Sequence, residues 1–148
     1  MCLTIQVRLV IKMKTIVAKA DLENEELFRK ASDILKSGGL VAFPTETVYG
    51  LGGDALNPKA SEKIYSAKGR PSDNPLIVHI ADTASVWKLA AEVSTQAQML
   101  MEAFWPGPLT IIFKKKDIVP HETTGGLETV AIRMPSHPAA MKLIKDSG

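Results

Sequence analysis

The segment 43–80, FPTETVYGLGGDALNPKASEKIYSAKGRPSDNPLIVHI, constrains the fold more than any other, because its short apolar runs alternate with loops rich in proline, glycine and polar side chains. The apolar run 40–43 stops at Pro44, which has no N–H for a continuing ladder, so it predicts a buried strand followed by a loop. A short helix is expected over 58–67 and a second buried strand over 76–80. In an open α/β sheet such loops line ligand crevices, so this segment holds the candidate site.

The loop 45–53 combines two threonine hydroxyls, a carboxylate and a phenol with glycines that let the backbone approach a ligand closely. A purely structural interpretation also fits, in which Thr45 and Thr47 cap turns and the glycines form them. Tyr49 belongs either to a pocket or to the core. The chemistry of this loop alone leaves both interpretations open.

The loop 68–75 carries two cations, Lys68 and Arg70, and an amide, Asn74. Pro71 follows Arg70, and Pro75 follows Asn74. Each proline restricts the residue before it, so Arg70 and Asn74 are directed toward extended backbone. Lys68 supplies a point charge and Arg70 a planar fork, which together suit phosphate oxygens. The alternative is a solvated basic turn.

Two predicted strands each carry one polar side chain that breaks an apolar run. On strand 76–80, His79 shares a face with Ile77 and lies opposite Leu76, Val78 and Ile80. A single histidine of this kind is more often structural than catalytic. On strand 129–134, Arg133 shares a face with Ala131, and a buried guanidinium there needs a partner. An anionic ligand is one candidate partner.

The remaining periodicity predicts alternating helices and strands. Asn24 is the expected N-cap of the first helix, whose inward face includes Phe28. This alternation is typical of the α/β class with mixed α+β layering. The further strands are expected over 15–18 and 109–113, a loop over 120–128, and helices over 24–36, 83–91, 95–104 and 139–145.

The bulk properties predict one soluble domain of 148 residues with a formal net charge of +2. The single cysteine, Cys2, cannot form an internal disulfide, which fits a reducing cytoplasm. Residues 1–13 lack the pattern of a signal peptide or membrane span, and are expected to be an extension or an edge strand before a domain over 14–148. The mild positive charge permits an RNA partner, although Lys114 to Lys116 are more simply a solvated strand end.

Four motifs occur in order along the chain: PTETVYGLG, KGRPSDNPLIVH, WPGPLT over 105–110 and VAIRMP over 130–135. Together they resemble the threonylcarbamoyl-AMP synthase family, the YrdC-type domain. The resemblance implies a twisted open mixed sheet flanked by helices. It also implies a nucleotidyltransferase that uses ATP, L-threonine and bicarbonate to make threonylcarbamoyl-adenylate, the donor for a modified adenosine in tRNA, together with tRNA-modification protein partners.

The resemblance assigns roles to residues in these motifs. It places Thr47, His79 and Arg133 on the L-threonine side, and Arg70, Asn74 and Thr129 on the ATP side. Lys68, with Arg70, is expected to face phosphate or the carbamate as a catalytic residue, while Thr45 and Tyr49 are second-rank candidates. No carboxylate cage for a metal is visible, so Mg²⁺ is expected to arrive with the nucleotide.

The sequence departs from the family pattern after its last predicted helix. Family members continue into a strand and a serine-x-asparagine motif, whereas this sequence stops at Gly148. We therefore expect a C-terminally incomplete domain, either a truncated or a natural short form, with weak binding and poor turnover. Two alternatives remain: an RNA-binding or regulatory module without synthesis, and a relative that uses carbamoyl phosphate.

Overall fold

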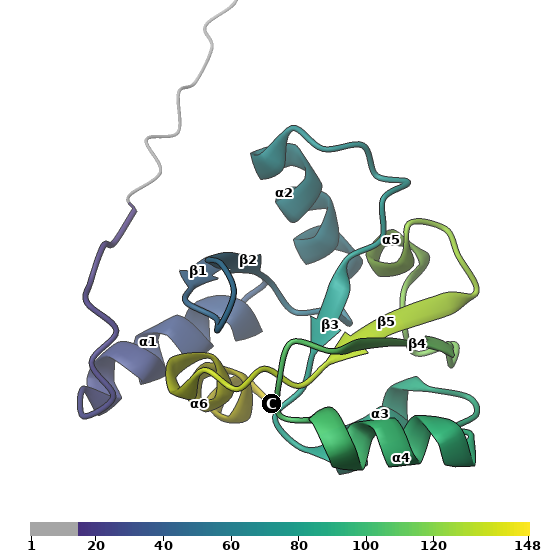
Figure 1. The fold of residues 1–148 in the computed structure, drawn as a ribbon. Coiled ribbons are helices and arrows are strands. Elements are labelled where there is room, and N and C mark those ends of the chain that lie inside the picture. Colours follow the sequence, from purple (N-terminus) through teal and green to yellow (C-terminus); the bar gives the residue numbers. More distant parts are fainter. Residues whose placement is uncertain (1–14) are drawn as a thin grey trace, which may run out of the picture.

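The computed structural model describes residues 15–148 (Figure 1). The predicted extension or edge strand over 1–13 lies outside these residues. The predicted strand 15–18 is wrong, because this segment is not assigned as a strand, pairs with no strand within 15–148, and has exposed side chains, with Val17 at 91%. Its apolar residues therefore bury nothing that would stabilise a ladder.

The described part alternates short helices and strands. Its elements in chain order are α1 (Glu25–Lys36), β1 (Val41–Phe43), β2 (Gly50–Gly52), α2 (Pro58–Lys68), β3 (Ile77–His79), η1 (Thr83–Ser85), α3 (Val86–Leu89), α4 (Thr95–Phe104), β4 (Thr110–Lys114), α5 (His121–Thr124), β5 (Thr129–Arg133) and α6 (Pro138–Ser147). No helix within residues 15–148 has the length and apolar character needed to cross a bilayer.

The strands form two small sheets. β1 and β2 are an antiparallel pair, while the second sheet has the order β3-β5-β4, with β3 parallel and β4 antiparallel to β5. This arrangement confirms the predicted α/β class with mixed layering. The prediction of one open sheet did not include the separation of β1 and β2 from the other strands.

Strand β2 lies where the sequence predicted only loop. Its glycines pair with β1, and the ring of Phe43 lies over them: a Cβ at Gly52 would be 2.7 Å from Cε1 of Phe43. The strand therefore depends on the absence of side chains rather than on an apolar pattern, which is why the loop 45–53 gave no strand signal.

Two other elements differ from the predictions. The predicted loop 120–128 contains the short helix α5, which ends at Gly125 in the left-handed region (φ 62°). The predicted helix 83–91 is a 3₁₀ turn followed by α3, which stops at Leu89 because Ala90 leaves the helix to bridge Lys115 on an extended segment. Both differences involve single turns, which side-chain periodicity does not resolve.

The apolar side chains form two clusters. The larger packs one face of the β3-β5-β4 sheet against α3 and α4, which lie below the sheet in Figure 1, and includes Ile132 and Val86 at 0% exposure. The smaller packs α1 against α6 and β1 through Phe28 and Leu143. The predicted N-cap is confirmed: the Asn24 side chain accepts a hydrogen bond from the Leu27 N–H at 3.0 Å.

Candidate functional site

The face of the β3-β5-β4 sheet that points away from the larger cluster carries all three predicted site residues that lie on strands: His79, Thr129 and Arg133. The strand register places His79, Arg133 and Thr110 side by side in one row. The next row is Ile77, Ala131 and Ile112, in which the isoleucines are 44% and 68% exposed. This sheet face is therefore open, and His79 and Arg133 lie together at the carboxyl ends of their parallel strands.

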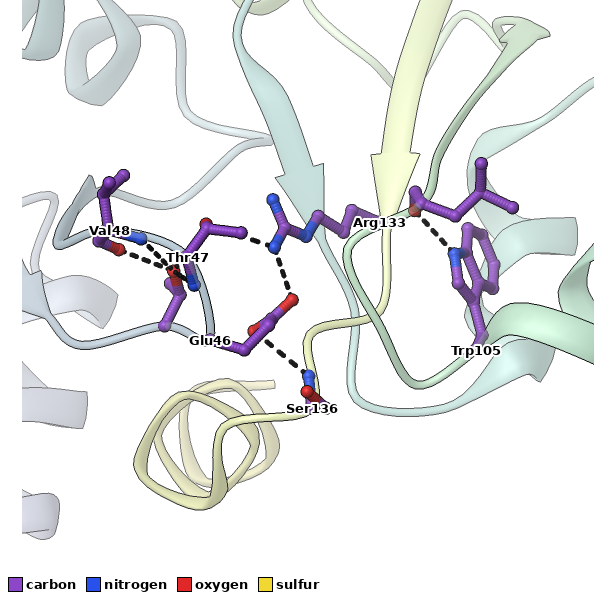
Figure 2. Close-up of polar contacts among 8 residues, drawn as sticks. Glu46, Thr47, Val48, Trp105, Arg133 and Ser136 are labelled. Carbon is purple, nitrogen blue, oxygen red and sulfur yellow. Dashed lines mark hydrogen bonds and ion pairs between the residues drawn. The ribbon is translucent and has the colours of Figure 1, made fainter.

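Arg133 reaches from the end of β5 to the loop between β1 and β2 (Figure 2). Its Nη2 donates hydrogen bonds to the Glu46 carboxylate and, at 3.3 Å, to the Thr47 hydroxyl. Its side chain is only 11% exposed, and its buried Nε has no hydrogen-bond partner among the described residues. The structure thus brings together Arg133 and Thr47, two of the three residues expected on the threonine side.

Glu46 is the partner that the buried charge of Arg133 required. Its other carboxylate oxygen accepts a hydrogen bond from the Ser136 backbone N–H at 3.2 Å. Burial alone raises the pKa of Glu46, but the hydrogen bonds from Arg133 and from backbone N–H groups outweigh it and hold that pKa below its usual value. Glu46 is therefore ionised at neutral pH.

The Glu46 pairing corrects one expectation about Arg133. The sequence suggested an anionic ligand as the partner of this guanidinium, whereas the structure supplies a protein carboxylate. The signal was present, since Glu46 is the lone carboxylate of the PTET motif and a buried cation needs an anion. Ser136, which contributes only a backbone N–H, left no signal in its residue type.

His79 is held at the end of β3 by two contacts. Its Nδ1 lies 3.1 Å from the Ile77 carbonyl oxygen, and its ring meets the Phe43 ring edge-on, with 6.1 Å between centroids. Because a carbonyl only accepts, a neutral imidazole here donates from Nδ1 and keeps a free lone pair on Nε2. Burial lowers the pKa of His79, and the nearby Arg133 charge lowers it further, so the neutral form is favoured.

The two second-rank residues behave differently. The Thr45 hydroxyl accepts hydrogen bonds from the backbone N–H groups of Thr47 and Val48, at 3.3 and 3.2 Å, and so caps its own turn. This geometry matches the structural interpretation for Thr45. Tyr49 is 80% exposed, which excludes the core interpretation for its ring.

The residues expected on the ATP side do not join this group. Lys68 is the exposed last residue of α2, and Asn74 is exposed in the loop that follows. Arg70 is half-buried; its Nη2 donates to the Pro75 carbonyl at 3.4 Å, and its buried Nε has no hydrogen-bond partner among residues 15–148. Within these residues no hydrogen bond or ion pair links this loop to Glu46, Thr47 or Arg133.

Thr129 is also separate from the cluster around Arg133. It begins β5 and pairs with Lys114, whereas Arg133 ends the same strand. At about 3.3 Å per residue, the two lie roughly 13 Å apart along the strand. They nevertheless share one sheet face, because their positions differ by an even number.

The described residues offer no ready protein cage for a metal ion. In the segment 15–148 no group of three or more His, Cys, Asp or Glu side chains is placed to hold one, and the carboxylate nearest the site, Glu46, already pairs with Arg133.

The comparison with family models identifies the fold. Residues 33–148 match the Sua5/YciO/YrdC model, whose description is "Telomere recombination". The chain belongs to the Sua5/YciO/YrdC family. This membership confirms the resemblance in the four sequence motifs, and the two small sheets with their flanking helices are therefore the form that the Sua5/YciO/YrdC fold takes over these residues.

Individual Sua5/YciO/YrdC relatives are also similar. The chain is 50% identical over 133 residues to the threonylcarbamoyl-AMP synthase of Pyrococcus abyssi, covering 90% of this chain and 39% of that protein. Identity to the Bacillus subtilis threonylcarbamoyl-AMP synthase is 54% over 126 residues, covering 84% and 36%. The crystal structure of P. abyssi Sua5 complexed with L-threonine superposes with a TM-score of 0.82 at 53% identity, covering 84% and 36%. The chain thus spans less than two fifths of the length of these relatives.

Proposed function

We propose that the chain acts as an L-threonylcarbamoyladenylate synthase, which makes threonylcarbamoyl-AMP and pyrophosphate from ATP, L-threonine and bicarbonate. The observation that carries the proposal is the grouping of Thr47, His79 and Arg133 at the carboxyl ends of β3 and β5. It is supported by the relatives named threonylcarbamoyl-AMP synthase and by the P. abyssi Sua5 complex with L-threonine.

The grouped side chains suit the parts of L-threonine. Arg133 has a buried Nε–H without an acceptor among the described residues, and a carboxylate is the kind of acceptor that a guanidinium binds best. The Thr47 hydroxyl lies beside this guanidinium, and the Nε2 lone pair of neutral His79 accepts a hydrogen bond from an ammonium or hydroxyl group. The site therefore offers a donor for the carboxylate and acceptors for the rest of the amino acid.

The reaction asks for placement and charge neutralisation more than for covalent catalysis. The threonine amine attacks bicarbonate and water is lost, which gives a carbamate. A carbamate oxygen then attacks the α-phosphorus of ATP. The bond between the α-phosphorus and the oxygen that bridges it to the β-phosphorus breaks, and pyrophosphate leaves. Cations near the phosphates stabilise the developing charge, and we assign Lys68 and Arg70 to this role. Asn74 and Thr129 complete the proposed ATP side.

Magnesium, when bound with ATP, would neutralise phosphate charge. In this proposal its ligands are the phosphates and water. We further propose that the chain works in the cytoplasm and passes its product to tRNA-modification proteins.

The alternative of an RNA-binding module rests on the mild positive charge and on Lys114 to Lys116, and the contacts of these lysines weaken the second support. Lys115 is buried and its Nζ donates to the Val119 carbonyl at 3.1 Å, while the Lys116 Nζ donates to the Trp87 carbonyl at 2.6 Å. Two of the three ammonium groups therefore stabilise the end of β4. The same lysine contacts also correct the expectation that the whole run is solvated.

A thermal-shift panel with L-threonine, ATP and carbamoyl phosphate, followed by an assay of pyrophosphate release, tests the proposed function. L-threonine is expected to raise the unfolding temperature, and pyrophosphate release is expected to need both threonine and bicarbonate. Stabilisation by carbamoyl phosphate but not by threonine would instead favour the carbamoyl-phosphate-using relative. Binding of RNA without any response to threonine or ATP would favour the RNA module.

A further inference from the structure

Glu46 connects three parts of the fold through one carboxylate. It lies in the loop between β1 and β2, one oxygen accepts from Arg133 Nη2 at the end of β5, and the other accepts from the Ser136 N–H before α6 (Figure 2). Its side chain is 17% exposed. A carboxylate bonded on both oxygens and mostly withdrawn from solvent has little freedom to move.

The anchoring of Nη2 determines how the rest of the guanidinium lies. An arginine side chain has many rotamers, and holding one of them costs conformational entropy. Glu46 and Thr47 both bind the same nitrogen, while the other terminal nitrogen points away from them in Figure 2 and Nε has no partner among the described residues. We propose that Glu46 is a positioning residue, which fixes Arg133 so that its remaining N–H groups meet the carboxylate of the substrate amino acid.

The geometry favours positioning over competition. A carboxylate that blocked the arginine would place both oxygens against the guanidinium in a bidentate pair. Glu46 instead uses one oxygen for Arg133 and gives the other to Ser136. It therefore neutralises and orients the cation without occupying all its donors.

This inference rests on the proposed binding of L-threonine, and a double-variant cycle tests it. Dissociation constants for L-threonine and ATP are measured for the parent chain, Glu46→Gln, Arg133→Lys and the double variant. Glu46→Gln is expected to weaken threonine binding about tenfold, as for losing one charge-assisted hydrogen bond, and to leave ATP affinity unchanged. In the Arg133→Lys background, Glu46→Gln is expected to have little further effect on threonine binding, because Glu46 acts by orienting the guanidinium that lysine lacks.

A matched control is Asp33→Asn, which removes the carboxylate of an exposed ion pair with Arg29 on α1. It is expected to leave threonine affinity unchanged. Tighter threonine binding by Glu46→Gln would identify Glu46 as a competitor and overturn the inference. A weakening that is equally large in the Arg133→Lys background would overturn it as well.

A second measurement separates this inference from the proposed function. The Arg133 Nε–H resonance, assigned by its loss in Arg133→Lys, reports the order of the guanidinium without any ligand. It is expected to be visible in the parent and to broaden by faster exchange in Glu46→Gln; an unchanged resonance would refute positioning. A parent chain that shows this ordered resonance but binds no threonine would refute the proposed function alone. If Glu46→Gln does not fold, Glu46→Asp, which shortens the side chain, takes its place with the same outcomes required.

Discussion

Arg133 is a charged residue on a strand whose neighbouring positions, Val130 and Ile132, are almost completely buried. Burying an unpaired guanidinium in such a place costs roughly several kcal/mol of folding free energy. The partners of Arg133 therefore indicate its role. One partner, Glu46, belongs to the protein, and the buried Nε has no hydrogen-bond partner among residues 15–148. A substitution that keeps the charge but removes the planar fork therefore separates the pairing of Arg133 with Glu46 from its proposed binding of a ligand carboxylate.

Arg133→Lys is expected to keep the fold, since lysine can still pair with Glu46 as a point charge. Threonine binding is expected to weaken by about 1 to 3 kcal/mol, the range for a lost charge-assisted hydrogen bond. ATP affinity should change much less. Titration calorimetry checks this, with Arg29→Lys, in an exposed pair with Asp33, as the matched control. Normal threonine binding by Arg133→Lys would assign the arginine to structure alone.

The lowered pKa of His79 leads us to expect that stability depends on pH. Burial lowers its pKa in the folded chain, so between the ordinary value of about 6.5 and the lowered one the unfolded state binds more protons. The stability that neutral His79 contributes is therefore complete above about pH 6.5 and is lost as the pH falls below it. Urea unfolding between neutral and mildly acid pH is expected to show a shallower loss for His79→Gln than for the parent. Equal slopes for the two proteins would refute this account.

At the scale of elements, Gly125, which follows the last residue of α5, packs against the loop after α2 that carries Arg70 and Asn74. It has a φ of 62°, and a Cβ there would lie 3.0 Å from the backbone carbonyl of Asp73 in that loop. Gly126 has a φ of 84° but open space around a Cβ. The two glycines thus share the backbone constraint and differ in the contact.

Both Gly125→Ala and Gly126→Ala are expected to lose about 1 kcal/mol or more of stability, because alanine is strained at positive φ. Only Gly125→Ala should also displace the Asp73 backbone, and with it weaken ATP binding. Chemical denaturation and ATP titration of the two variants measure these effects. Identical ATP affinities would show that α5 does not position this loop.

The sequence predicted the elements whose signal is local and missed those whose cause is distant. The helix 24–36 begins with a capping residue and repeats apolar side chains every turn, and strand 129–134 alternates small, apolar and charged residues, so both were found. Strand β2 consists of a leucine between two glycines, and the ring of Phe43 occupies the space that side chains at Gly50 and Gly52 would fill. Such a cause lies on another strand, where periodicity does not reach.

For the candidate site, too, the sequence predicted local features and missed contacts between distant residues. The pattern of strand 129–134 placed Arg133 on the open face with Ala131, and the structure agrees. Its pairing with Glu46 joins residues 87 positions apart, which only the fold can bring together. The assignments of Arg70, Asn74 and Thr129 to ATP came from the family motifs, and they remain predictions.

At the scale of the whole molecule, the two apolar clusters differ in size. Counting the residues that the structure describes, the larger one contains 12 buried residues and the smaller one Phe28, Ala139 and Leu143. Local opening costs less where less apolar surface is buried. Amide hydrogens of α1 and α6 are therefore expected to exchange faster than those of β4 and β5 under native conditions. Uniform protection across all four elements would show that the clusters open as one unit.

The packing of α1 against α6 also has a consequence for how the chain is made. The Ser32 hydroxyl on α1 donates to the carbonyl of Asp146 on α6 at 2.8 Å, across a separation of 114 residues. At about 5 to 20 residues per second, a ribosome completes α1 on the order of ten seconds before its partner. During this interval the apolar stripe of α1 lacks the cover that α6 provides. The β3-β5-β4 sheet is also incomplete until late, because β5 directly precedes α6 along the chain. Helix α1 therefore reaches its final packing only after β5 and α6 have been made.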